Sequence, residues 1–127
     1  MARGLLPPRS PAERAAIVRA KARLDRLALY PEPVDIGRVR ILHTPRLFAL
    51  PWFRRFDGYA AWNTILLRAA PAGEADDDLV THELCHVWQM QHRPLAMPLS
   101  YLRGYAANRY EVEARRAVEA TRPPPAS

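Results

Sequence analysis

The apolar segment 79–91 constrains the fold more than any other part of this sequence. Its hydrophobic side chains recur at the spacing of a helix that packs in a protein core. Three ionisable side chains, His82, Glu83 and His86, interrupt that apolar pattern. Because burying such groups without partners is costly, the segment predicts a core helix packed against another element that supplies those partners.

The spacing of these three residues is typical of a zinc site. His82 and His86 lie one helical turn apart on the same face, so both imidazoles can reach one zinc ion. Glu83 lies about 100° further round the helix, where it can reach a water molecule on that ion. Zinc lowers the pKa of such a water to about 7, and the carboxylate can pass its proton to a leaving amine. The spacing therefore predicts Glu83 as a catalytic base.

The segment His82-Glu83-Leu84-Cys85-His86-Val87-Trp88-Gln89 resembles the active-site helix of the zincin metallopeptidases. Residues 108–114 are similar to the next helix of minimal gluzincin-type domains of bacteria, and the resemblance spans roughly residues 35–120. It implies a zincin-like domain in which His82, His86 and Glu111 bind one zinc ion and Glu83 is the catalytic base. Arg115 stands where several branches of the group carry an Asp or Asn that supports a ligand histidine.

Two glutamates compete for the role of third ligand. Glu111 and Glu113 lie about 200° apart on a helix, so only one of them can face the metal. Glu113 has Arg109 and Arg116 at helical spacing, which predicts ion pairs on an exposed face. The neighbours of Glu111 on its own face are small or apolar, which permits close packing of two helices. Helical periodicity and the family resemblance both favour Glu111.

Other residues are alternatives for roles at the site. His92 lies ten residues after His82, as in the metzincins, but Gln89 stands where those proteins have a helix-ending glycine. The candidates for a donor to the oxyanion are Tyr101, Tyr105, Tyr110 and His92. Cys85 is expected to be a packed thiol and His43 an ordinary histidine at a strand end. The segment Trp62-Asn63-Thr64-Ile65 is either an edge strand that pairs with substrate or a core strand.

The remaining sequence predicts an α+β fold. The expected elements are an N-terminal helix at 11–30, strands at 39–43 and 59–68, the motif helix at 79–91 and a last helix from 98 or 99 to 120. Ser10 caps the first helix, and proline-punctuated residues 45–58 form a loop. We expect flexible ends at 1–10 and 122–127 around a single zincin-like domain, 11–121, with a small mixed sheet.

Composition limits the location and the partners of the chain. No run approaches the roughly 18 apolar residues of a membrane-spanning helix, and prolines interrupt the start where a secretory signal is apolar. We therefore expect a cytoplasmic protein that does not bind membranes. The net charge is +6, yet residues 71–92 contain five acids and no Lys or Arg. The basic N-terminal half, with Trp52, Phe53, Arg54 and Arg55, makes nucleic-acid binding a third hypothesis, although no recognised module accompanies it.

These observations favour a zinc-dependent metallopeptidase that hydrolyses a peptide or protein substrate through a water activated by Glu83. The alternative is a zincin fold that serves as a metal-binding or protein-interaction module with little turnover. Metal content separates both hypotheses from nucleic-acid binding, and replacement of Glu83 by glutamine separates the first from the second. The oligomeric state is left open by the sequence.

Overall fold

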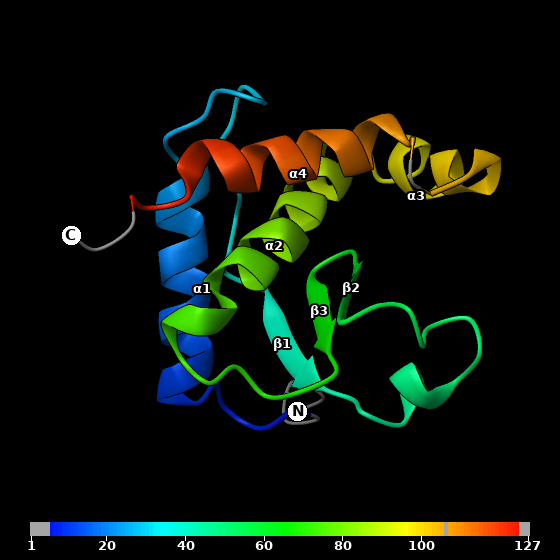
Figure 1. Cartoon of the computed structure of the whole chain (residues 1–127). Helices are drawn as coiled ribbons and strands as arrows, with labels where there is room; N and C mark the ends of the chain where they lie inside the picture. Colours follow the sequence, from blue (N-terminus) through cyan, green and yellow to red (C-terminus); the bar gives the residue numbers. More distant parts are fainter. Residues whose placement is uncertain (1–5, 106, 125–127) are drawn as a thin grey trace.

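The structure is a computed structural model that describes residues 6–105 and 107–124. The flexible ends expected at 1–10 and 122–127 fall partly on residues 1–5 and 125–127, which lie outside the described residues. In chain order the elements are α1 (Pro11–Leu24), β1 (Arg40–His43), β2 (Gly58–Ala61), β3 (Thr64–Leu67), α2 (Asp77–His92), α3 (Ala96–Ser100) and α4 (Arg109–Thr121). The predicted α+β class is confirmed, as is the order of helix, strands, motif helix and following helix (Figure 1).

The three strands form one mixed sheet in the order β1-β3-β2. Strand β1 is parallel to β3, whereas β2 and β3 form an antiparallel hairpin. The prediction of a single strand over 59–68 is therefore wrong, because the chain reverses at Trp62 and Asn63. Trp62 adopts the left-handed backbone conformation, with φ of 54°, which a tight hairpin turn requires. Apolar residues on both sides of this turn concealed it in the sequence pattern.

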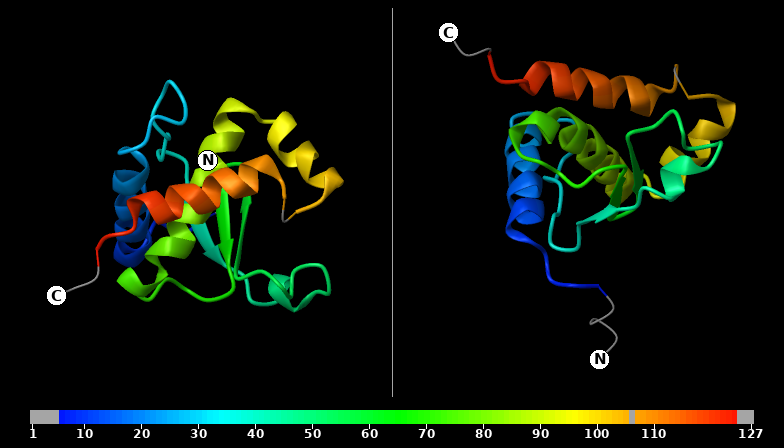
Figure 2. Two further views of the ribbon diagram at one scale, coloured as in Figure 1. Left: turned by 45° about the horizontal axis from the view of Figure 1, so that its top comes forward. Right: turned by 60° about the horizontal axis from the view of Figure 1, so that its bottom comes forward.

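Helix α2 lies between the sheet and α4, with α1 packed along its side (Figures 1 and 2). Val80, Leu84 and Val87 of α2 are each fully buried in the main core. The motif helix is thus the central element of the fold, as the apolar pattern of 79–91 predicts. In the described part of the chain, no helix has both the length and the apolar character that crossing a bilayer requires.

Two helices are shorter than predicted. Helix α1 ends at Leu24, and just after it the amides of Arg26 and Leu27 bond to carbonyls three residues back, which tightens the chain there. The helix expected from 98 or 99 to 120 is wrong in its first half, because the chain forms α3, a short 3-10 turn and then α4. Gly104 lies between them with φ of 126°, a conformation that suits glycine. Asn108 then caps α4 through its side-chain oxygen.

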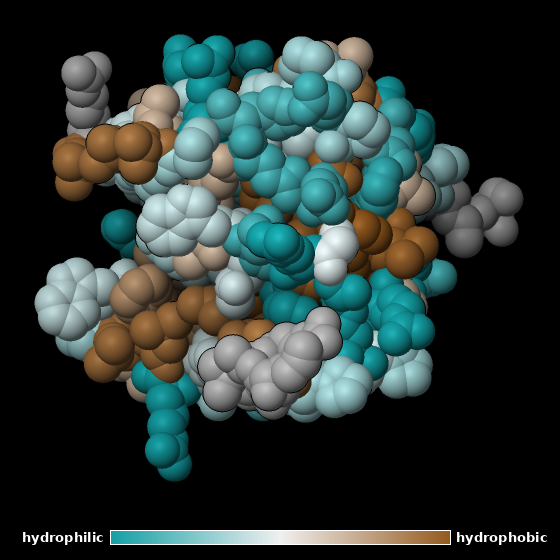
Figure 3. Space-filling model, turned by 180° about the vertical axis from the view of Figure 1, so that it is seen from behind, coloured by the Kyte–Doolittle hydropathy of each residue, from teal (hydrophilic) through white to brown (hydrophobic). Residues whose placement is uncertain are grey.

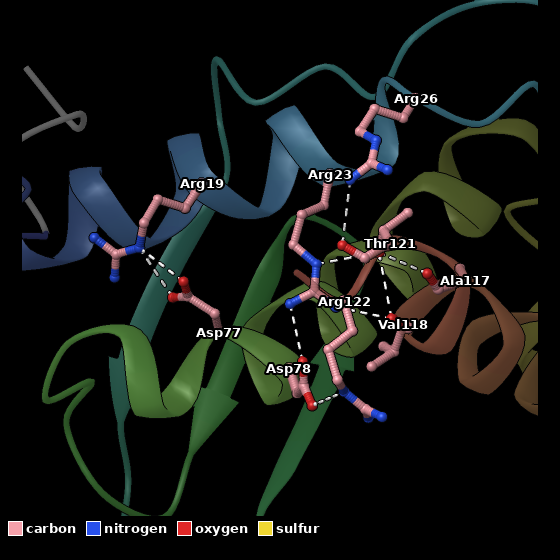
Figure 4. Close-up of polar contacts among 9 residues, drawn as sticks. All are labelled: Arg19, Arg23, Arg26, Asp77, Asp78, Ala117, Val118, Thr121 and Arg122. Carbon is pink, nitrogen blue, oxygen red and sulfur yellow. Dashed lines mark hydrogen bonds and ion pairs between the residues drawn. The ribbon is translucent and has the colours of Figure 1, made fainter. Parts of the chain in front are cut away.

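A buried arginine joins three helices near the start of α2 (Figure 4). Arg23 of α1 is 8% exposed and donates to the Val118 carbonyl and the Thr121 hydroxyl of α4. It also bonds to Asp78 in the first turn of α2, at 2.9 Å. Asp78 accepts a second bond from Arg122. The acidic start of α2 thus pairs with basic side chains of its two neighbouring helices, which holds α2 in place.

Candidate metal centre

The structure brings His82, His86 and Glu111 together between α2 and α4. The Nε2 atom of His82 lies 2.8 Å from one carboxylate oxygen of Glu111, and Nε2 of His86 lies 2.9 Å from the other. One ligand atom from each residue falls within 4.8 Å of the other two, so this group can hold a metal ion. Two imidazoles and a carboxylate converge on one point from two helices, and His86 and Glu111 are 25 residues apart in the sequence.

The electrostatics of this group depend on mutual hydrogen bonding in a buried place. Glu111 is 2% exposed and His86 is 6% exposed. Burial alone raises the pKa of Glu111, but the bonds from His82 and His86 hold it well below its ordinary range. Burial alone lowers the pKa of His86, but the bond to Glu111 and the charge of Glu83 raise it overall. The site is therefore a carboxylate held between two imidazoles, and a metal cation would replace the shared protons.

Glu83 lies beside this group without belonging to it. Its side chain is buried, and burial raises its pKa despite the opposing charges of His86 and His82. No group in 6–105 or 107–124 donates a hydrogen bond to the Glu83 carboxylate, which borders a cavity. A raised pKa and an uncommitted carboxylate are the properties of a general base or acid.

The cavity next to Glu83 has a volume of about 230 Å³. It lies between the segment 55–60, α2 and the segment 97–105. Its apolar wall is formed by Phe56, Ala60, Met90, Met97, Tyr101 and Tyr105. The polar groups that reach it include Glu83, His86, Glu111 and Arg55. The cavity is smaller than the roughly 300–1,000 Å³ typical of drug-sized ligands, so its size suits a single side chain or a small group.

Exposed apolar side chains lie within or next to the two segments that line the cavity. Leu50 and Trp52 precede the segment 55–60, and Leu95, Leu99 and Leu102 lie within or just before the segment 97–105. Seen from behind, two brown groups of atoms separated by a hollow lie on the side where these segments project (Figure 3). Apolar surface of this kind is typical of a site that contacts another molecule.

Of the candidate oxyanion donors, Tyr101 and Tyr105 line the cavity. The Tyr101 hydroxyl lies 3.4 Å from a Glu111 oxygen, and burial raises the pKa of both tyrosines. Tyr110 and His92 do not line this cavity. Tyr110 is buried against Met90 and Met97, and its hydroxyl accepts a bond from Arg109.

The two competitors of Glu111 lie elsewhere. Glu113 was expected among Arg109, Arg116 and solvent, and that expectation is wrong: its carboxylate accepts bonds from Tyr30 and Gln89. Helical spacing showed which residues share a face with Glu113 but not that this face turns toward α2. The ring of His92 stacks on Tyr30 at 4.8 Å between centroids and is not part of the metal-binding group.

Sequence reasoning missed Gln89 as a functional residue. Its side chain is fully buried and lies 2.7 Å from Nδ1 of His86. The available signal was a polar residue inside an apolar helix, three positions after a predicted ligand. The other expectations for α2 and β1 agree with the structure, since Cys85 is buried and free and His43 is exposed at the end of β1.

No family model, curated protein or solved structure matches the chain in comparisons with known proteins. Three features of the structure bear on function: a group of three side chains that can hold a metal ion, a buried carboxylate beside it, and an apolar cavity that adjoins both.

Proposed function

We propose that this chain is a zinc-dependent peptidase of the zincin type, with residues 11–121 forming its single domain. The observation that carries the proposal is the Glu111 carboxylate of α4 held between His82 and His86 of α2, beside a cavity that also contains Glu83. Two imidazoles and one carboxylate are the three protein ligands of a well-known class of catalytic zinc site. Such a site leaves a fourth position for water or substrate.

Zinc, when bound, supplies a Lewis acid and lowers the pKa of a coordinated water to about 7. Glu83 would act as the base that takes a proton from the attacking water and delivers it to the departing amine. Its burial favours this role, because a raised pKa brings the carboxylate closer to the working pH. Tyr101 and Tyr105 keep their hydroxyl protons, since burial raises both pKa values, and they can donate to the carbonyl oxygen of a substrate.

An extended peptide is the substrate that fits the surroundings. Strand β2 is at one end of the β1-β3-β2 sheet, and Gly58, Tyr59 and Ala60 of this strand line the cavity. A peptide can pair with such an edge through its backbone and insert a side chain into the adjacent pocket. Of the two alternatives for residues 62–65, Thr64 and Ile65 follow the core-strand one, because β3 is the central strand of the sheet. The apolar wall of the cavity favours an apolar side chain.

The experiment that tests this function compares Glu83→Gln with the wild-type protein. Both are purified without chelator, analysed for zinc, and incubated with a mixture of peptides whose cleavage is followed by mass spectrometry. We expect cleavage by the wild type and at least about a 100-fold loss in the variant, because a general base contributes about 10²–10⁴-fold. Glu119→Gln, on the exposed face of α4, is the matched control and should cleave normally.

The zinc content shows whether a loss of cleavage comes from loss of the base or from loss of the metal. Retention of zinc by Glu83→Gln together with loss of cleavage supports the proposed role of Glu83. Zinc bound by a wild type that cleaves none of the peptides would favour the alternative, a metal-binding module with little turnover. Equal cleavage by Glu83→Gln and wild type would overturn the proposed mechanism.

A further inference from the structure

Gln89 is a fully buried polar side chain in the centre of α2, and each of its polar atoms has a partner. Its Oε1 lies 2.7 Å from Nδ1 of His86. Its Nε2 donates to the Tyr110 carbonyl at 2.8 Å and to a Glu113 carboxylate oxygen at 3.0 Å. Buried amides with every polar atom satisfied have a single orientation, because any other leaves donors or acceptors unpaired.

This orientation fixes the position of a proton on His86. The Tyr110 carbonyl and the Glu113 carboxylate can only accept hydrogen bonds, so both must face the NH₂ group of Gln89. The Oε1 atom of Gln89 therefore faces His86 and can only accept, which requires a hydrogen on Nδ1 of the imidazole. In the neutral ring, Nε2 then carries the lone pair.

That lone pair points into the metal-binding group. Nε2 of His86 lies 2.9 Å from a Glu111 oxygen, which is itself an acceptor. Two facing acceptors repel one another, so the arrangement requires a cation between them, either a proton or a metal ion. We propose that Gln89 is a positioning residue that holds His86 in the tautomer that binds a metal through Nε2. This inference deepens the proposed function and depends on its metal site.

Glu113 and Tyr30 extend this support to a second layer. The Tyr30 hydroxyl donates to the same Glu113 oxygen that accepts from Gln89, at 2.9 Å. Tyr30 is held in turn by stacking on His92 and by an edge contact with Trp88. Glu113 and His92, the two alternative ligands in the sequence, therefore support a ligand in the fold.

The role of Gln89 also explains how the site can lack the Asp or Asn that the resemblance to zincins places at position 115. In metal sites the second ring nitrogen of a ligand histidine usually donates to a carboxylate, a carbonyl or a water, which fixes its orientation. The resemblance to zincins places an Asp or Asn for this purpose where this chain has Arg115. The amide carbonyl of Gln89 supplies an equivalent acceptor from α2 itself, one turn after His86.

The first test measures zinc affinity by competition with a chromophoric chelator, with zinc alone as the ligand. Gln89→Leu removes the acceptor, and we expect zinc to bind about 10–100-fold more weakly. Gln91→Leu is the matched control, since Gln91 lies on the same helix but bonds to Asp35 and Asn63. The control should bind zinc within about twofold of the wild type.

A double variant tests the chemistry instead of the packing. Gln89→Glu combined with Glu113→Gln exchanges the two side chains and keeps both an acceptor for Nδ1–H of His86 and an amide donor between the two positions. We expect this exchange to recover most of the affinity lost in Gln89→Leu. Wild-type affinity in Gln89→Leu, or no recovery in a folded double variant, would overturn the proposal.

The wild-type protein alone supplies a measurement that needs no variant. Nitrogen-15 NMR of the metal-free protein distinguishes the two ring nitrogens of His86, and we expect Nδ1 to carry a hydrogen whether or not a second proton lies between Nε2 and Glu111. A neutral ring with its hydrogen on Nε2 would contradict the role of Gln89. If the wild type binds no zinc, the proposed function fails, yet this measurement still decides the tautomer.

Discussion

The position of Glu83 can be tested through a glycine that the side chain packs against. A Cβ atom at Gly58 of β2 would lie 3.1 Å from Cδ2 of Leu67 and 3.2 Å from both Cγ and Oε2 of Glu83. These distances are shorter than the roughly 3.5–4.0 Å of favourable carbon contacts. Leu67 is buried in the sheet, whereas Glu83 borders the cavity. Gly58→Ala should therefore displace Glu83 toward the cavity.

The size of the effect follows from two opposing terms. Overpacking costs about 1–3 kcal/mol, and replacing glycine by alanine returns about 0.4–1 kcal/mol by restricting the unfolded chain. We expect a net loss of roughly 0.5–2 kcal/mol in the free energy of unfolding. Zinc binding should be unchanged, because the three atoms nearest to the new methyl group belong to Leu67 and Glu83 and not to His82, His86 or Glu111. Peptide cleavage should fall by about 10–100-fold, since a displacement of about 1 Å can cost 10²-fold in rate.

Three measurements on one preparation check this prediction: urea unfolding, zinc content and the initial rate of peptide cleavage. Gly37→Ala is the control, because a Cβ there meets only the exposed Asp35 carboxylate. Its stability should stay within about 0.5 kcal/mol of the wild type. Wild-type stability and cleavage in Gly58→Ala would refute the packing of Glu83 against β2.

Two further predictions concern stability. In the metal-free protein, the raised pKa of His86 contributes stability that is complete below its unfolded pKa of about 6.5 and is lost as the pH rises through the folded value. The lowered pKa of Glu111 contributes stability that is present above its unfolded pKa of about 4.3 and is lost as the pH falls through the folded value. With EDTA present, calorimetry should therefore give the highest Tm between about pH 4.5 and 6.5, and a Tm that rises steadily from pH 6 to 9 would contradict this. Arg23→Leu should lower the free energy of unfolding in urea by about 2–3 kcal/mol, because it removes buried hydrogen bonds made by a charged group. The control Lys21→Ala breaks only an exposed pair on one helix and should lower it by less than about 0.5 kcal/mol. Equal losses in the two variants would show that the Arg23 bonds contribute little.

Local spacing in the sequence was sufficient for the central features of the fold. The four-residue separation of His82 and His86 fixes a shared helical face, and the apolar residues around them require a buried helix. The small neighbours of Glu111 indicate close packing between two helices, and Ala114 is indeed fully buried. These features depend on residues within one or two helical turns, which is the range that periodicity describes well.

Features that depend on distant residues could not be predicted in this way. The turn at Trp62 and Asn63 has apolar and β-branched residues on both sides, so strand propensity did not reveal it. One partner of Gln89 is Glu113, 24 residues away on another helix. The arginines near Glu113 in the sequence suggested that it lies on a solvated face. In the structure Glu113 points toward α2 and Tyr30 instead. Tertiary contacts decided its environment.

Metal analysis of the purified protein decides whether His82, His86 and Glu111 bind zinc. The protein is prepared without chelator, supplied with zinc and desalted, and its zinc is measured by inductively coupled plasma mass spectrometry. The variants His86→Ala and Glu111→Ala and the control His92→Ala are measured in the same way. We expect about one zinc per chain in the wild type and in His92→Ala, and almost none in the other two variants. A wild type that takes up no zinc, or a Glu111→Ala variant that holds as much zinc as the wild type, would contradict a metal site formed by α2 and α4.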